Sequence, residues 1–226
     1  LIFPLSFLFF FGFLNTDWGD NGHWQQWPIA YVGYSYGAAV SWCADANKEI
    51  NLPKLLDLHV FKDSAGMMGR AVYDIGNVYQ YPGVIPHNGS VLHHLLLRNP
   101  DSEQHISKLT VDALERTENF VESSLDNVNR ARVSGIEGQR MVTEIRHVAK
   151  LLRYACHAGI AGRRAIDMEP WGRPDQILPA HHDHNTLPPH VTAEIRKISA
   201  PTRRILGTEL GKLVEEYREL WQIRSR

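Results

Sequence analysis

The sequence predicts a mostly α-helical protein, and three observations support this prediction. After Pro100, apolar residues recur every three or four positions along three long stretches, which is the period of a helix with one buried face. The alternating pattern of a half-buried strand is nearly absent after residue 20. With 226 residues, of which 43% are hydrophobic and 22% charged, the chain has the composition of an ordinary globular protein.

The first 100 residues carry shorter helical signals. Apolar and small residues are nearly continuous over residues 27–44, and Pro28 suits the first turn of a helix that starts there. Two further short helices are expected in LPKLLDLHVF and SAGMMGRAVYDIGNVYQ, with Asn51 and Ser64 as their N-caps. The segment YPGVIPHNGS is predicted to be a loop, because it contains two prolines and two glycines and has no apolar period.

Each of the three long helices carries an apolar stripe that must pack on another helix or on the preceding segment. The stripes comprise Ile106, Leu109, Val111, Leu114, Phe120, Val121, Leu125 and Val128 in the first, Met141, Ile145, Val148, Leu152, Cys156 and Ile160 in the second, and Leu206, Leu210, Leu213, Val214, Tyr217, Leu220 and Trp221 in the third. The proline-rich segment EPWGRPDQILPAHHDHNTLPPH separates the second helix from the third and is predicted to be a loop.

The chain starts with an uncharged apolar run, LIFPLSFLFFFGFL. The run is shorter than the ~20 residues of a transmembrane helix. It also lacks the initiating Met, the basic region and the cleavage site of a signal peptide. Its second half is compatible with a buried parallel strand. We interpret the chain as one that has lost its front, and a residual signal or anchor segment is the alternative.

Charge and cysteine content argue against several classes of site. The formal net charge of −1 gives no indication of nucleic-acid binding or of attraction to a charged membrane surface. Cys43 and Cys156 are too few for a disulfide framework, and both are predicted to be reduced core residues. We interpret HHDH at residues 181–184 as a solvated loop, because consecutive residues do not easily converge on one ion. No metal or other cofactor is predicted.

The segment GYSYG at residues 33–37 matches the G-x-S-x-G pattern of a hydrolase nucleophile elbow, with Ser35 as the nucleophile. An elbow needs a buried strand before the serine and a sheet of many strands around it. Too little strand material surrounds Ser35 for such a sheet. We therefore predict that residues 33–37 are part of the helix that starts near Pro28, with small residues four apart allowing a neighbour to approach closely.

The most distinctive chemistry lies in TDWGDNGHWQQW at residues 16–27, which contains three Trp, two Asp, one His, one Asn and two Gln. Aromatic rings stack on the C–H face of a pyranose, and carboxylates accept hydrogen bonds from its hydroxyl groups. The segment is therefore a candidate sugar site. The alternative is a capped turn in which Asp17 or Asp20 caps the next helix and the Trp side chains pack in the core.

Three stretches, FLNTDWGDNGHWQ, YVGYSYGAAVSWC and LDLHVFKD, resemble the end of the catalytic barrel in bacterial enzymes related to family 20 glycoside hydrolases, the β-N-acetylhexosaminidases. The C-terminal EYRELWQIRSR resembles the closing helix of the same enzymes. The resemblance covers nearly the whole chain from Phe13. It implies a remnant of the last strand and helix of a (β/α)8 barrel at residues 1–100, and a helical C-terminal domain at residues 101–226.

The resemblance also implies a set of substrate-binding residues. Trp18 matches the Trp that walls the −1 sugar subsite, and Asp20 matches the acid of the Trp-Gly-acid turn. His23 and Trp24 are weaker matches to the same rim. In this family the 2-acetamido group of the sugar is the nucleophile, and an adjacent Asp-Glu pair orients it and supplies the general acid. The chain contains no Asp-Glu dipeptide, so no catalytic residue is assigned and we expect the chain itself to be inactive.

The sequence thus favours a fragment of a glycoside hydrolase that removes terminal β-linked N-acetylhexosamine from a glycan. One alternative is a serine esterase that uses Ser35, and another is a non-enzymatic helical protein held at a membrane by its N-terminal run. Without the other barrel strands, the apolar faces of residues 1–44 are expected to be exposed and to promote self-association. The sequence leaves the compartment open, with the cytoplasm favoured over secretion.

Overall fold

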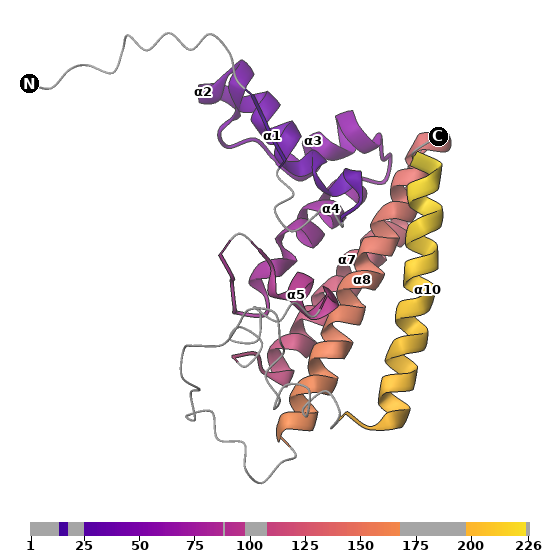
Figure 1. Cartoon of the computed structure of the whole chain (residues 1–226). Helices are drawn as coiled ribbons and strands as arrows, with labels where there is room; N and C mark the ends of the chain where they lie inside the picture. Colours follow the sequence, from indigo (N-terminus) through magenta and orange to yellow (C-terminus); the bar gives the residue numbers. More distant parts are fainter. Residues whose placement is uncertain (1–13, 18–24, 88, 98–107, 168–197, 225–226) are drawn as a thin grey trace, which may run out of the picture.

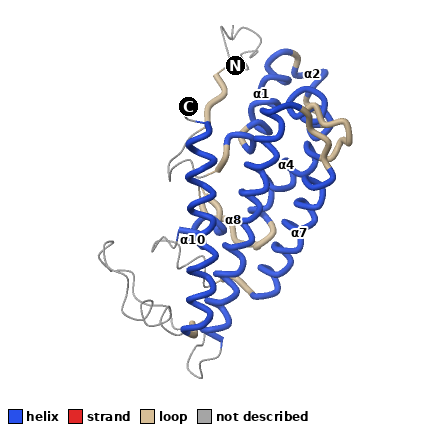
Figure 2. The backbone as a smooth tube through the Cα atoms, turned by 90° about the vertical axis from the view of Figure 1, so that its right-hand side faces the viewer, coloured by secondary structure: helices blue, strands red, loops and turns tan. Residues whose placement is uncertain are grey.

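The protein is mostly helical, as the sequence predicts (Figures 1 and 2). The computed structural model describes residues 14–17, 25–87, 89–97, 108–167 and 198–224. Within these ranges there is no strand, and the single β-contact is an isolated bridge between Asp63 and Val133. The strand predicted for the second half of the N-terminal run falls outside the described residues, apart from Leu14.

Short helical segments make up the N-terminal part. They are η2 (Trp27–Ile29), α1 (Tyr31–Trp42), α2 (Ala44–Asn47), α3 (Leu52–Leu55), η3 (Leu56–Phe61), α4 (Met68–Asn77), η4 (Val78–Gln80) and α5 (Val91–Leu97). Pro28 lies at the start of η2, as predicted. Asn51 is confirmed as the N-cap of α3, since its side-chain oxygen accepts a hydrogen bond from the Lys54 N–H at 3.0 Å.

The prediction that Ser64 caps the next helix is wrong. Helix α4 begins at Met68, and the carboxylate of Asp63 accepts hydrogen bonds from the N–H groups of Met67 (2.8 Å) and Met68 (2.9 Å). The Ser64 hydroxyl instead donates to the carbonyl of Arg132 at 3.3 Å. A carboxylate has two oxygens that accept, so Asp63 satisfies more of the free N–H groups at the helix start than a hydroxyl can.

The three long helices are confirmed. They are α7 (Val111–Arg130), α8 (Gly135–Asp167) and α10 (Ala200–Arg224). Thr110 caps α7 by accepting a hydrogen bond from the Ala113 N–H at 3.2 Å. Only a short connection separates α7 from α8, so the two helices run antiparallel.

Helix α8 is the central helix of the fold (Figure 1). Its 33 residues give it a length of about 50 Å. Helices α5 and α7 share the main core with it, and α10 packs along another side. A side chain at Gly159 of α8 would collide with its neighbours, because an added Cβ would lie 2.9 Å from Leu114 Cδ1 and 3.0 Å from Leu95 Cδ1. Gly159 therefore lets both neighbouring helices approach α8 closely.

The main core crosses the domain boundary that the sequence analysis placed at residue 100. Buried members from the first part include Leu56, Phe61, Met68, Val72 and Leu92, and members from the second part include Leu114, Val121, Ile145 and Cys156. The short helices and the long helices thus share one apolar core. The assignment of residues 1–100 to a barrel remnant stays a prediction.

Ion pairs border the α7–α8 contact in antiparallel order. Glu115 of α7 accepts a hydrogen bond from Arg164 of α8 at 2.8 Å, and Glu118 lies 2.6 Å from His157 Nε2. The second ring nitrogen of His157 lies 3.5 Å from Glu209 of α10, so this histidine contacts both neighbouring helices. Such partly exposed pairs each contribute about 0–1 kcal/mol, and they fix the register more than the stability.

Helix α10 packs on α8 through one narrow seam. Its buried side chains, Leu206, Leu213 and Leu220, are seven residues apart, which is the spacing of a two-helix coiled-coil contact. Leu206 and Leu213 form a second, smaller core with Tyr154 and Ala158 of α8. The remaining faces of α10 are mostly exposed, so this seam and its polar contacts hold the helix in place.

Polar contacts connect α8 and α10 at two positions along the helices. Near the C-terminal end of α10, Arg224 donates two hydrogen bonds to Glu144 (2.6 and 2.8 Å) and a further one to Glu137. In the middle of the seam, Lys150 donates to both carboxylate oxygens of Glu216 (2.7 and 2.8 Å). The Glu144 side chain is 2% exposed and the Arg224 side chain 24%, so this pair is largely removed from water.

Replacement of Glu144 by Gln should weaken the docking of α10, because the partly buried Arg224 guanidinium then loses its charged partner. We expect a loss of about 2–3 kcal/mol in the free energy of unfolding, measured by urea denaturation with circular dichroism. Glu137→Gln is the matched control: the Glu137 side chain is 52% exposed, and its loss should cost below about 1 kcal/mol. Equal effects of the two substitutions would contradict this prediction.

Candidate functional site

The predicted sugar-binding residues lie outside the described residues. They are Trp18, Asp20, His23 and Trp24, all within residues 18–24. The HHDH segment at residues 181–184 also lies outside the described ranges. Both assignments therefore stay predictions.

The described segments on either side of residues 18–24 are held beside α1. Asn15 donates a hydrogen bond from Nδ2 to the carbonyl of Gly33 in α1 at 3.1 Å. On the other side, Gln26 is 3% exposed and directly precedes η2, where Ile29 packs against the main core. The Gln26 Nε2 group has no hydrogen-bond partner among the described residues. A buried donor without a hydrogen-bond partner lowers the stability of the fold by about 1–3 kcal/mol. Gln26 is therefore a candidate to bind a polar group.

Ser35 lies in the middle of α1, and the helical interpretation of the G-x-S-x-G pattern is confirmed. A nucleophile elbow would place the serine on a turn between a strand and a helix, whereas residues 33–37 are all helical. The close approach expected at the small residues does not occur at Gly33, where an added Cβ would meet no atom within 4 Å, whereas Gly37 is buried. The described part of the chain thus lacks the local geometry that an esterase based on Ser35 needs.

Two buried carboxylates beside an open groove form the most unusual charged cluster in the described part of the chain. Asp57 is 9% exposed and Asp63 7%. Both line a groove of about 610 Å³. The charged neighbours around the groove are basic: Lys54, Lys62 and Arg70.

Asp63 joins two distant segments of the chain. Its Oδ1 accepts hydrogen bonds from the N–H groups of Ala65 (3.0 Å) and of Arg132 (2.6 Å), which lies between α7 and α8. Its Oδ2 accepts the two bonds at the start of α4. Burial by itself would raise the pKa of Asp63, but these four N–H groups outweigh it and hold the pKa below its usual value.

Asp57 is held differently. Its Oδ1 accepts a hydrogen bond from the Gly69 N–H at 2.6 Å. Burial raises the pKa of Asp57, the nearby charge of Asp63 adds to the rise, and the N–H groups of Gly69 and Met68 oppose it. An added Cβ at Gly69 would lie 2.0 Å from the carbonyl oxygen of Pro53, so only glycine permits the close contact of α4 with α3 at this point.

Two carboxyl groups with opposite pKa shifts beside a groove are typical of an acid/base pair in an active site. Here the contacts with the backbone account for the position of both carboxylates, because Asp57 and Asp63 accept hydrogen bonds from the free N–H groups at the start of α4. We therefore interpret the pair as structural. The prediction of Ser64 as the cap overlooked this pair, although Asp63 directly precedes Ser64, and Asp and Ser are equally good N-caps.

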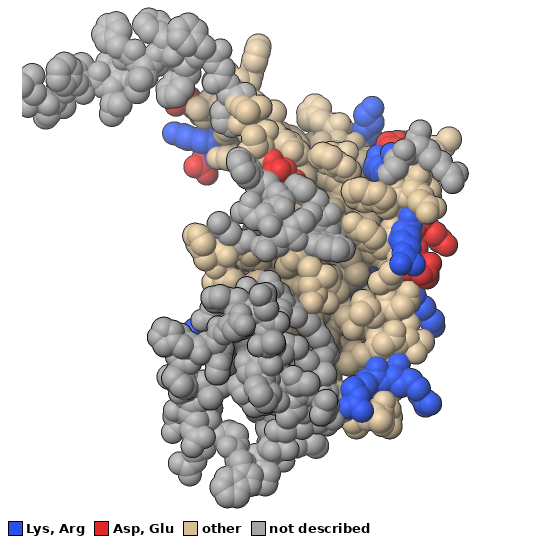
Figure 3. All heavy atoms as spheres, viewed as in Figure 1, with Lys and Arg blue, Asp and Glu red and all other residues tan. Residues whose placement is uncertain are grey.

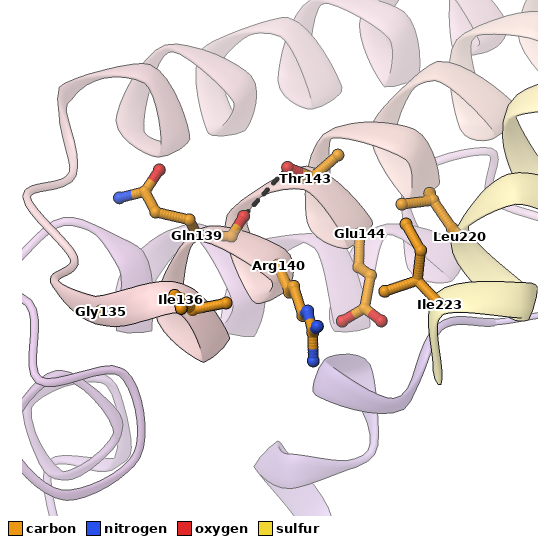
Figure 4. A pocket seen from close by; sticks show the side chains of 8 residues that line it. All are labelled: Gly135, Ile136, Gln139, Arg140, Thr143, Glu144, Leu220 and Ile223. Carbon is orange, nitrogen blue, oxygen red and sulfur yellow. Dashed lines mark hydrogen bonds between the residues drawn. The ribbon is translucent and has the colours of Figure 1, made fainter. Parts of the chain in front are cut away.

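A second groove, of about 550 Å³, lies between the start of α8 and the end of α10 (Figure 4). Its apolar walls are Ile136 of α8 and Leu220 and Ile223 of α10. The polar groups in it are already paired: Thr143 donates to the Gln139 carbonyl at 2.9 Å, and Glu144 accepts from Arg224. The groove offers apolar surface without a free reactive group among its lining residues.

His147 and Cys156 are buried in the core, whereas Cys43 is exposed. His147 is fully buried, and its Nε2 lies 3.0 Å from the Leu213 carbonyl. Burial lowers the pKa of His147 and so favours the neutral ring. Burial also raises the pKa of the Cys156 thiol to about 12, which makes it unreactive and confirms Cys156 as a core residue. The same prediction is wrong for Cys43, which is exposed because the outer side of α1 and α2 is uncovered.

No group of three or more potential metal ligands occurs among the described residues. In that part of the chain, no helix combines the length and the apolar character needed to cross a membrane. No family model, curated protein or solved structure matches this chain.

Replacement of Asp63 by Asn should destabilise the fold by about 2–4 kcal/mol, because an amide nitrogen would then take the place of one oxygen and face its two N–H donors, those of Ala65 and Arg132 or those of Met67 and Met68. The native pKa of Asp63 lies below the ordinary aspartate value of 3.8. Its contribution is therefore present above about pH 4 and is lost as the pH falls through the native pKa. Urea unfolding of both proteins from pH 7 to pH 3 measures the difference, which should shrink at the acid end.

Asp126→Asn is the control for removal of a carboxylate, because Asp126 is exposed on α7. We expect this control to change the unfolding free energy by less than about 0.5 kcal/mol. If Asp63→Asn matched the control, or if its effect were the same at pH 3 and pH 7, the assigned role of Asp63 would be wrong.

Proposed function

We propose that the chain is the C-terminal part of a family 20-like glycoside hydrolase, whose whole protein removes terminal β-linked N-acetylhexosamine. The sequence resemblance supplies the family, and one structural observation supports it. Helix α1, in the middle of the resembling region, has no charged residue, yet one of its 12 residues is buried and five are exposed, while Tyr31 and Val32 pack against the main core.

The sequence of α1, YVGYSYGAAVSW, contains no charged residue. A helix without a polar face normally lies between other elements. Of its 12 residues, all of them described, one is buried: Gly37. Trp42 is 89% exposed, Tyr36 40%, and the preceding Trp27 53%. In the space-filling view most atoms around α1 are uncharged (Figure 3).

Such a surface needs a partner body, and the remainder of a (β/α)8 barrel is the partner that the resemblance implies. In this proposal α1 packs against the barrel as its last helix. In this proposal, the exposed side chains of α1 are those that the rest of the barrel would cover.

In the same proposal, residues 18–24 supply one wall of the sugar subsite. Trp18 stacks on the C–H face of the sugar, and Asp20 accepts hydrogen bonds from its hydroxyl groups. The anchored position of Asn15 and the unsatisfied buried amide of Gln26 support a binding role for this region. The general acid and the residue that orients the acetamido group come from other barrel strands, so the chain alone performs no hydrolysis.

Binding of N-acetylglucosamine, followed by tryptophan fluorescence, tests the proposal. The chain should bind the sugar weakly, with a dissociation constant on the order of millimolar. Trp18→Ala and Asp20→Asn should each weaken binding at least about fivefold, because they remove a stacking face and a charged acceptor. Hydrolysis of the p-nitrophenyl β-glycoside of N-acetylglucosamine by the chain should stay at the buffer rate.

Trp42→Ala is the matched control, because Trp42 is an exposed tryptophan of the same region but lies at the far end of α1. It should leave the sugar affinity unchanged. Absence of saturable binding, or an equal loss in Trp42→Ala and Trp18→Ala, would refute the sugar site. Turnover of the glycoside by the purified chain would refute the expectation of an inactive fragment.

A further inference from the structure

Helix α10 lies along α8 and is attached to it by a small contact (Figure 1). Of its 25 residues, all of them described, three are buried: Leu206, Leu213 and Leu220. The core that Leu206 and Leu213 form with α8 is separate from the main core. Among the described residues, the main core contains members of α4, α5, α7 and α8 and none of α10. Removal of α10 would therefore open the small core and leave the main core as it is.

His147 belongs to the α8 face that contacts α10. Together with Leu151, Tyr154 and Ala158 it forms a row whose members are alternately four and three residues apart, which is the spacing of a helix–helix contact. The His147 side chain is fully buried, and its Nε2 lies 3.0 Å from the carbonyl oxygen of Leu213 in α10. A carbonyl oxygen only accepts, so Nε2 carries a proton in this contact and donates it to α10.

The other ring nitrogen of His147 has no acceptor for a second proton. Nδ1 is buried and has no hydrogen-bond partner in the described part of the chain. A proton on Nδ1 would create a buried N–H group without an acceptor, and a buried positive charge. The Tyr217 ring of α10 lies 5.8 Å away between ring centroids, and burial raises the pKa of its hydroxyl, so it supplies no negative charge. The docked form therefore requires the neutral imidazole.

The charged groups near His147 do not compensate for a proton on its ring. Glu216 of α10 favours the charged ring, whereas Lys150 of α8 disfavours it. These two side chains are bonded to each other at 2.7 and 2.8 Å. Glu144, one turn before His147 on α8, is paired with Arg224 of α10. Burial is the largest effect on His147, and it lowers the pKa.

The charged contacts between α8 and α7 are separate from the buried histidine. Arg146 donates to the side-chain oxygen of Asn129 in α7 at 3.2 Å. The other histidine of α8, His157, lies 2.6 Å from Glu118 of α7 and 3.5 Å from Glu209 of α10, one carboxylate at each ring nitrogen. A proton on His157 therefore supports the docking of α10.

We propose that α10 is a releasable helix, and that uptake of a proton by His147 releases it from α8. The proton comes from the solvent and binds Nδ1, and the hydrogen bond from Nε2 to the Leu213 carbonyl breaks on release. Water then accepts from both N–H groups of the charged ring. The main core holds α4, α5, α7 and α8 together in the released form. The proposal is independent of the proposed sugar site.

Acid should weaken the docking of α10, because the released form takes up the proton more readily than the docked form. An exposed histidine has a pKa of 6.5, and the native pKa of His147 lies below it. Docking is therefore strongest above about pH 7 and weakens as the pH falls through 6.5 toward the native pKa. Between pH 7 and pH 5 the docking equilibrium constant should fall by at least about threefold and at most about 25-fold, the limit for a ring that is protonated only after release.

Hydrogen–deuterium exchange of the full chain, followed by mass spectrometry, tests the release. Exchange rates at pH 7, 6 and 5 are corrected for the intrinsic effect of pH on amide exchange. The amides of α10 should lose protection by the same factor as the docking equilibrium constant, while those of α7 keep theirs. Unchanged protection of α10 between pH 7 and pH 5, or equal losses in α10 and α7, would overturn the proposal.

His147→Gln separates this histidine from the other titratable groups. The glutamine amide can donate to the Leu213 carbonyl and takes up no proton in this range, so the protection of α10 should be the same at pH 5 and pH 7. His93→Gln is the matched control, because burial also lowers the pKa of His93, which lies on α5. This control should keep the acid response of α10. A response that survives in His147→Gln, or one that disappears in His93→Gln, would contradict the role of His147.

A second measurement needs no substitution. Exchange of the imidazole C2 hydrogen, measured by mass spectrometry on the peptide that contains His147, reports the protonation of this ring in the native chain. Its midpoint should lie at a lower pH than in the urea-unfolded chain. A midpoint at or above that of the unfolded chain would refute the proposal, even if His147→Gln failed to fold.

Discussion

The structure depends on helix α8, which must be covered along two of its sides at once. On one side its apolar residues join the main core with α5 and α7, and Gly159 allows both helices to come close. On the other side it presents Tyr154 and Ala158 to α10. The same side contains Glu144 and His147, which are almost fully buried. A helix of this kind cannot satisfy its polar groups alone, so these groups stay buried only while both neighbours are in place.

The N-terminal part is fixed to this bundle by a polar contact as well as by the shared core. The carboxylate of Asp63 accepts hydrogen bonds from the start of α4 and from Arg132, in the connection between α7 and α8. Its pKa is held low because the N–H groups prefer the charged form. Asp63 therefore links segments that are 69 residues apart, and it ties the start of α4 to the connection between α7 and α8.

The apolar side chains of α1 and of α10 are covered to different degrees. Helix α1 has no charged residue, and one of its 12 residues is buried, which suits burial against a large body such as the rest of a barrel. On α10, Leu206, Leu213 and Leu220 are buried, and Leu210 and Tyr217 pack against α8 beside them. Val214 and Trp221 are 39% and 47% exposed, and the Trp221 ring stacks on Tyr217.

The sequence by itself determined the helical class and the positions of the three long helices, because their apolar residues follow the helical period over many turns. It also determined the cap at Asn51, the helical state of Ser35 and the burial of Cys156. These features depend on near neighbours along the chain, or on a strong local pattern. The residues in TDWGDNGHW that carry the predicted sugar site depend on a resemblance, and they stay a prediction.

Only the tertiary structure decided the rest. The cap of α4 is Asp63 and not Ser64, because Asp63 also meets the N–H of Arg132, which is distant in sequence. Cys43 is exposed, because no described element covers its side of α1. The apolar residues of α10 form one broad face in the sequence, whereas in the structure Leu206, Leu213 and Leu220 are buried against α8 and Val214 and Trp221 are 39% and 47% exposed. Burial is set by which surfaces meet in space, and the period of a single helix does not contain that information.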